Sequence, residues 1–70
     1  MTKEEKKYIA LGKTFRSARE GLKLTQTEVA EKSGVSVNYY ARIERGEENP
    51  TFDILQKVMK VLHIKSLDIL

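Results

Sequence analysis

Two helix start signals lie close together in the middle of this chain, with a glycine between them. Thr25 and Glu28 have the spacing of a capping box, in which each side chain accepts a hydrogen bond from the other residue's backbone N–H. Ser36 is a second capping residue, and Gly34 suits the left-handed conformation that ends many helices. The sequence therefore predicts two short helices joined by a tight turn, together spanning about residues 25–45.

Helix signals also flank this pair on both sides. Thr2 and Glu5 form another capping box, which opens a helix expected over about residues 3–22. Thr51 opens a later helix, and Ser66 caps a short C-terminal stub. No strand pattern is present, so the fold class is predicted as all-α, a compact bundle of four to five helices.

The helix that begins at Thr51 is apolar over a wide surface, which predicts that other helices largely enclose it. Its apolar residues form two neighbouring rows, Phe52, Leu55, Met59 and Leu62 in one and Ile54, Val58 and Val61 in the other.

Length and cysteine content limit how this fold is stabilised. The 70 residues fit a single domain, expected to occupy residues 1–70. The absence of cysteine excludes disulfides and thiolate zinc sites. Because so small a domain has only marginal stability alone, dimerisation is expected to supply the rest. The sequence has neither a signal peptide nor an apolar run long enough to cross a bilayer, so we expect a soluble, cytoplasmic protein.

Charge gives weaker guidance about partners. The net charge of +3 favours nucleic acid only slightly. Residues 24–50 hold 3 basic and 5 acidic groups, so the central segment is itself slightly acidic. No nucleophile constellation or glycine-rich phosphate loop is present, and the single histidine, His63, is expected to be a favourable neighbour of a helix C-terminus. We therefore expect no enzyme activity, no cofactor and no metal.

Several short motifs lie between Gly12 and Leu62: Thr25-Gln26, Glu28-Val29-Ala30, Gly34-Val35-Ser36, Ile43-Glu44-Arg45-Gly46 and Asn49-Pro50, with Arg16 and Arg19 upstream. In residue type and spacing these motifs resemble the phage repressor and Cro-type helix-turn-helix family. The resemblance implies a lambda-repressor-like fold and a sequence-specific DNA-binding transcriptional regulator. Lys23 departs from the family, which often has glycine just before the leucine-threonine pair.

The helix that follows Ser36 has two chemically different sides. Each residue advances about 100° around a helix, which places Tyr40, Ile43 and Glu44 together and turns Asn38 and Arg42 to the opposite side. Arginine pairs with guanine, asparagine with adenine, and small apolar groups meet the thymine methyl. The alternative interpretation is that Asn38 and Arg42 are ordinary solvent-exposed surface residues without a role in DNA binding. The predicted base-contacting residues are Ser36, Val37, Asn38, Ala41 and Arg42.

Phosphate contacts are expected beside this helix. Gln26 lies at the first helical position after a cap, where N–H groups and the helix dipole attract phosphate, and the resemblance implies that it also braces the reading helix. Tyr39 donates its hydroxyl to a phosphate or, equally well, serves as a packing residue. The predicted phosphate-contacting residues are Gln26, Tyr39, Arg45 and Asn49.

Glu44 is an unusual residue for a DNA-facing segment, because a carboxylate repels phosphate. The helical wheel turns it inward, where an unpaired carboxylate is costly. The resemblance supplies Arg19 as its partner, so Arg19 and Glu44 are interpreted as a structural ion pair.

A homodimer on double-stranded DNA is the expected assembly. It would read a pseudo-palindromic operator whose half-sites lie about 34–36 Å apart. The predicted dimer interface consists of Ile64, Leu67, Ile69 and Leu70, unless these residues fold back to close the monomer core. The rival hypothesis is a protein-interaction module, such as an antitoxin that binds a toxin, and the acidic segment 24–50 favours it. Salt separates the two, because DNA binding weakens steeply with ionic strength.

Overall fold

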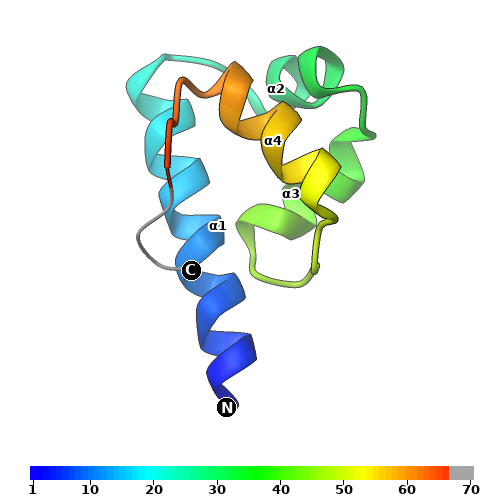
Figure 1. The fold of residues 1–70 in the computed structure, drawn as a ribbon. Helices are drawn as coiled ribbons and strands as arrows, with labels where there is room; N and C mark the ends of the chain where they lie inside the picture. The colour runs from blue at the N-terminus through cyan, green and yellow to red at the C-terminus, as the bar shows by residue number, and fades with distance from the viewer. Residues whose placement is uncertain (67–70) are drawn as a thin grey trace.

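A computed structural model describes residues 1–66 as four helices joined by short connections. The helices are α1 (Lys3–Gly21), α2 (Gln26–Ser33), α3 (Val37–Glu44) and α4 (Phe52–Val61). In Figure 1 the long α1 runs along one side of the molecule and the three shorter helices lie together on the other. Over residues 1–66 there is no strand, which agrees with the all-α prediction, and no helix is both long and apolar enough to span a membrane. The stub predicted after Ser66 lies outside the described residues.

Every helix begins at the capping residue that the sequence indicates. The hydroxyl oxygens of Thr2, Thr25, Ser36 and Thr51 each accept a hydrogen bond, 3.0–3.2 Å long, from the N–H three residues later. At Thr2 and Thr25 the capping box is complete, because the glutamate carboxylate accepts the threonine N–H at 3.0 and 2.8 Å. Such caps contribute about 1 kcal/mol each to helix stability, which is why local sequence sets the helix starts.

The helix ends share one backbone pattern. A residue in the left-handed conformation follows each helix: Lys23 and His63 with φ of +59°, Gly34 with +76° and Gly46 with +77°. The N–H of the residue after each of these bonds to a carbonyl five positions earlier, at 2.9–3.1 Å, as in a Schellman motif. Lys23, where the resembled family often has glycine, therefore keeps a backbone that favours glycine.

This observation makes Lys23→Gly an expected stabilising change. The left-handed conformation costs a non-glycine residue about 1–2 kcal/mol, and the extra entropy of glycine in the unfolded chain cancels only part of that gain. We expect the melting temperature, followed by circular dichroism, to rise by about 2–6 °C. Lys23→Ala is the matched control, since alanine removes the long side chain but keeps the strain. An equal gain from both variants would assign the effect to the side chain instead of the backbone.

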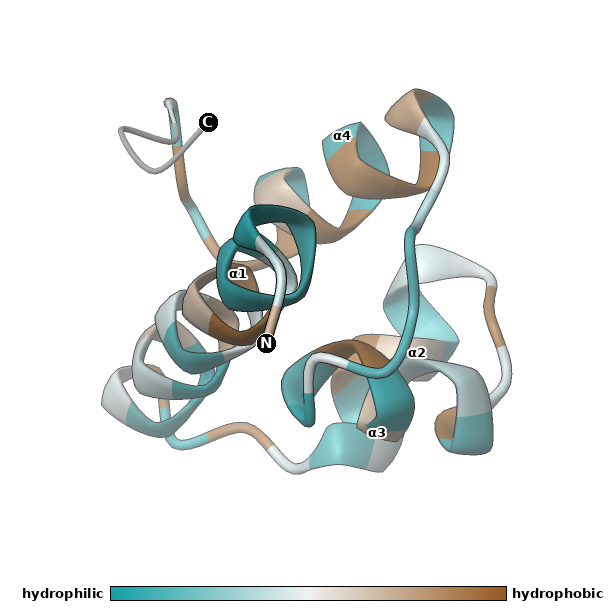
Figure 2. Cartoon of the chain, turned by 90° about the horizontal axis from the view of Figure 1, so that it is seen from below, coloured by the Kyte–Doolittle hydropathy of each residue, from teal (hydrophilic) through white to brown (hydrophobic). Residues whose placement is uncertain are grey.

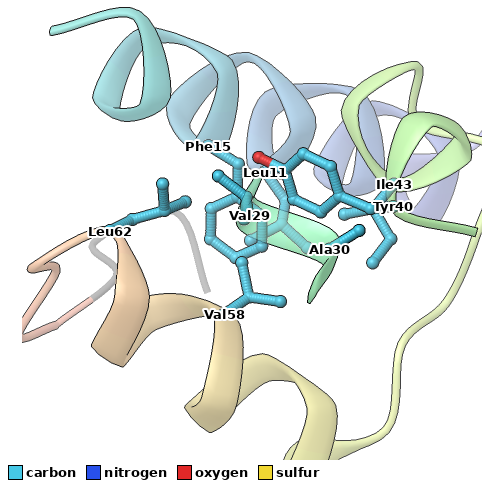
Figure 3. Packing of buried hydrophobic residues seen from close by; sticks show 8 residues of the cluster. All are labelled: Leu11, Phe15, Val29, Ala30, Tyr40, Ile43, Val58 and Leu62. Atoms are coloured by element: carbon cyan, nitrogen blue, oxygen red, sulfur yellow. The ribbon is translucent and has the colours of Figure 1, made fainter. Parts of the chain in front are cut away.

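The core lies where the helices meet. Phe15 of α1 and Tyr40 of α3 supply its two aromatic rings, both fully buried. Figure 3 shows the core side chains pointing into the space between the helices. They are Leu11, Phe15, Val29, Ala30, Tyr40, Ile43, Val58 and Leu62. The helix pair α2–α3 thus shares one core with α1 and α4.

Helix α4 is less enclosed than its apolar rows predict. Val58 and, just past the helix, Leu62 are buried, but Phe52 is 73% exposed and the other apolar residues of α4 are half-buried. Hydrophobic bands along α4 are visible in Figure 2. The prediction of a largely enclosed helix was wrong because α4 packs chiefly against α2. Periodicity shows how much apolar surface a helix offers, and it does not show how many neighbours cover that surface.

Helices α1 and α3 approach closely at a glycine. A Cβ atom on Gly12 would lie 2.5 Å from the carbonyl oxygen of Ile43 and would clash with the carbonyl oxygen of Glu44 as well. Just beyond α3, a Cβ on Gly46 would lie 2.7 Å from the side chain of Ile9. All three contacts are shorter than real Cβ atoms tolerate, so the end of α3 fits against α1 only because these two positions lack a side chain.

Candidate nucleic-acid interface

The two sides of α3 differ in burial. Tyr40, Ile43 and Glu44 are buried against the other helices. The residues on the opposite side and at the start of the helix are exposed or half-buried: Ser36, Val37, Asn38, Ala41, Arg42 and Arg45. The structure therefore brings all five predicted base-contacting residues to the solvent side of one short helix.

The inner side of α3 is held by an ion pair. Arg19 donates to the two oxygens of the Glu44 carboxylate, from Nε at 2.7 Å and from Nη2 at 3.1 Å. Gln26 adds a bond from its Nε2 at 2.9 Å. The Arg19 side chain is 14% exposed and that of Glu44 is 3% exposed. One carboxylate thus connects α3 to both α1 and α2.

The environment of this pair keeps it ionised. Burial by itself would raise the pKa of Glu44, but the hydrogen bonds from Arg19 and Gln26, together with the positive charge of Arg19, outweigh burial and hold that pKa below its ordinary value. The bond to Glu44 in turn raises the pKa of Arg19. Burial raises the pKa of Tyr40, and the neighbouring Glu44 raises it further, so the Tyr40 phenol stays protonated. The charge of Glu44 is therefore neutralised inside the protein.

The four predicted phosphate-contacting residues lie at the N-terminus of α2, on α3 and in the segment after it. Gln26 is the first residue of α2 and is half-buried, with its amide engaged by Glu44. Tyr39 is also half-buried. Arg45, at the end of α3, and Asn49, in the loop, are both exposed. Gln26 consequently has a structural role in addition to any contact with DNA.

Most acidic side chains of residues 24–50 have partners within the protein. Glu28 belongs to a capping box, and Glu44 is buried with its arginine. Glu47 and Glu48 form ion pairs with arginines of the α3 region, at 3.1 and 2.7 Å. Four of the five acidic side chains of this segment are therefore already engaged by groups of the protein itself, which weakens the argument for an acidic docking surface.

The partner of Arg42 was not foreseen from the sequence. Its Nε lies 2.7 Å from Oε2 of Glu48, and the two side chains are 41% and 26% exposed. The pair spans six positions across the turn at Gly46, a spacing at which neither a helix nor a strand brings two side chains into contact. The turn itself is signalled by the glycine, but the side-chain contact that it creates has no sequence signature.

Of the predicted dimer interface, the structure describes one residue. Ile64 is half-buried and packs against the core, whereas Leu67, Ile69 and Leu70 lie outside the described residues. Within residues 1–66, there is no group of three or more histidine or acidic side chains that could hold a metal ion.

The chain is similar in sequence to curated transcriptional regulators. An uncharacterised HTH-type transcriptional regulator of Mycobacterium tuberculosis is 36% identical over 55 residues, covering 79% of this chain and 39% of the relative. The immunity repressor protein of Bacillus phage phi105 is 37% identical over 57 residues, covering 81% of this chain and 40% of the repressor. The chain therefore spans about two fifths of the length of these curated relatives.

A solved structure of another gene regulator is also similar to this chain. The crystal structure of ClgR, the clp gene regulator of Corynebacterium glutamicum, superimposes with a TM-score of 0.79 at 35% identity, covering 81% of this chain and 61% of ClgR. The family described as Helix-turn-helix matches residues 15–70, which include all of α2, α3 and α4. The chain therefore belongs to the Cro/repressor-type helix-turn-helix family of transcriptional regulators.

Proposed function

We propose that this chain binds a specific sequence in double-stranded DNA as a homodimer, with α3 in the major groove. The observation that carries the proposal is the division of α3 into a buried side, fixed through Glu44, and a solvent side that holds Asn38 and Arg42. A relative named as an immunity repressor and a neighbour named as a gene regulator support a role in transcription.

Each solvent-facing residue of α3 has an assigned base chemistry. Arg42 offers paired N–H donors to the O6 and N7 atoms of guanine, and Asn38 offers a donor and an acceptor to adenine. Val37, which is 44% exposed, and the small Ala41 meet thymine methyl groups. Ser36, exposed at the start of α3, completes the set of base contacts.

Phosphate contacts position the helix in the groove. Gln26 at the start of α2 and Tyr39 on α3 are assigned to phosphates of the DNA backbone, because helix N-termini attract phosphate and tyrosine hydroxyls donate to it. Arg45 and Asn49, both exposed after α3, are assigned to further phosphates. These contacts carry affinity and its salt dependence, while the outward residues of α3 carry sequence preference.

One short helix touches only a few base pairs, so useful specificity requires two copies. A twofold dimer would place two α3 helices about 34–36 Å apart, one turn of DNA. We assign the dimer contact to the C-terminal apolar segment, Ile64, Leu67, Ile69 and Leu70.

Selection of bound sequences from a random DNA pool tests the whole proposal. We expect an inverted repeat with half-sites one helical turn apart. Arg42→Ala should relax the preference at one position in each half-site by about 1–3 kcal/mol. Arg45→Ala should instead weaken all sequences equally and reduce the salt slope by about 1. Arg45 is the better phosphate control than Gln26, which also supports Glu44.

Two results would contradict the proposal. If no sequence were enriched, this chain would not be a sequence-specific DNA binder. If Arg42→Ala selected the same consensus with the same discrimination, α3 would not be the reading helix.

A further inference from the structure

Arg42 is held by two neighbouring side chains before any DNA is present. Its guanidinium lies 5.9 Å from the centre of the Tyr39 ring, which is within reach of a cation–π contact. Its Nε donates to Glu48 at 2.7 Å, a short, charge-assisted hydrogen bond. The three groups form a cluster on the solvent side of α3.

The loop that carries Glu48 is itself fixed. Gly46 is left-handed, and the N–H of Glu47 bonds to the carbonyl oxygen of Arg42 at 2.9 Å, so the chain turns back toward α3. Gly46 also lies against the backbone of Ile9 in α1, and Pro50, two residues after Glu48, is buried. The carboxylate is therefore held at a defined place beside Arg42.

The bond to Glu48 engages only one edge of the guanidinium. Across residues 1–66, the hydrogen bond from Nε to Glu48 is the one that the Arg42 side chain makes. The N–H groups of Nη1 and Nη2 therefore remain available, and two donors at the end of the side chain match the two acceptors, O6 and N7, that guanine presents in the major groove. Glu48 also offsets the positive charge of Arg42, which reduces its attraction to phosphates of any sequence.

We propose that Glu48 is a positioning residue for base reading: it holds Arg42 so that the terminal nitrogens face guanine, and so increases specificity at the expense of general DNA affinity. This inference rests on the proposed function above. Its physical basis is that a pre-ordered side chain loses less conformational entropy on binding. The ordering benefits only the sequence with guanine at the matching position, while the removed charge lowers affinity for every sequence.

The test compares three variants on the selected operator and on a copy whose Arg42-dependent guanine is replaced. Glu48→Ala removes both the carboxylate charge and the hydrogen-bond acceptor, whereas Glu48→Gln removes the charge and keeps an acceptor oxygen. Glu47→Ala is the matched control, because Glu47 lies in the same loop and pairs with Arg45, at 3.1 Å, instead of Arg42. The measurement is the dissociation constant for the replaced sequence divided by the dissociation constant for the selected operator, both at the same salt concentration.

We expect Glu48→Ala to lower this ratio by about three- to tenfold, the cost of ordering one long side chain on binding. Its affinity for the replaced sequence should rise, because a negative charge near DNA has been removed. Glu48→Gln should raise affinity for both DNAs and largely preserve the ratio, and Glu47→Ala should do the same. In an Arg42→Ala background, Glu48→Ala should no longer change the ratio.

Two results would contradict these expectations. If Glu48→Ala, Glu48→Gln and Glu47→Ala all raised affinity and left the ratio unchanged, Glu48 would act only as a repulsive charge, and the positioning role would be refuted while DNA reading stood. If the parent protein did not distinguish the two DNAs, the proposed function itself would fail.

Discussion

Replacing Arg19 with alanine is expected to lower the free energy of unfolding by about 3–5 kcal/mol, the usual cost of removing one partner from a buried ion pair. The Glu44 carboxylate, 3% exposed, would lose both bonds from Arg19 and keep the one from Gln26. A domain of this length has roughly 4–10 kcal/mol of stability in total. The variant should therefore be partly unfolded near physiological temperature, as measured by urea or thermal unfolding.

The pH dependence of this effect follows from Glu44. Its folded-state pKa lies below its ordinary value of 4.5, so the ion pair contributes fully above that value and loses its contribution as the pH falls below it. The stability difference between the parent protein and Arg19→Ala should thus be large at neutral pH and shrink below about pH 4.

Arg16→Ala is the control for this prediction. Arg16 lies on the same helix and pairs with Glu20 at 3.3 Å, but the two side chains are 65% and 56% exposed. Water screens such a pair, so the melting temperature should change by no more than about 4 °C. If Arg19→Ala were as mild as Arg16→Ala, the pair would not be what holds α3 in place.

Gly12→Ala is expected to destabilise the fold by about 3 kcal/mol, near the upper end for overpacked sites. The added methyl would lie 2.5 Å from the carbonyl oxygen of Ile43 and 2.7 Å from the carbonyl carbon of Glu44. Both are backbone atoms, which cannot rotate away, so α1 and α3 would have to separate. The direction opposes helix propensity, because alanine is favoured over glycine inside a helix by about 1 kcal/mol.

Gly21→Ala provides a matched control in the same helix. No atom lies within 4 Å of a Cβ placed there, so propensity alone should act and stability should stay level or rise by up to about 1 kcal/mol. Equal unfolding midpoints for the two alanine variants would show that the α1–α3 contact has room for a methyl group.

Local chemistry explains why much of this fold was predictable. Thr25 and Ser36 indicate helix starts, because their capping hydrogen bonds reach only three residues along the chain. Gly34 indicates a helix end, because glycine readily adopts the left-handed backbone conformation found there. The inward direction of Tyr40 and Ile43 follows from the helical period and their apolar character. Each of these signals is complete within about ten residues of sequence.

The features that were missed depend on contacts between distant or irregularly spaced segments. The exposure of Phe52 depends on which helices cover α4, and its apolar character cannot report that. The need for glycine at position 12 depends on backbone atoms of α3, more than thirty positions away. The approach of Glu48 to Arg42 depends on how the chain leaves the turn at Gly46. The predicted contacts with DNA and with a second subunit stay predictions.

The separation of α3 into an anchored side and an exposed side bears on how the DNA sequence preference could change. Glu44 is anchored from α1 and α2, whereas Asn38 is exposed and the Val37 side chain is 44% exposed. Under the proposed function, exchanging these outward residues would alter the chemistry offered to a base and leave the anchoring bonds intact. A new DNA sequence preference would then arise with little loss of thermal stability.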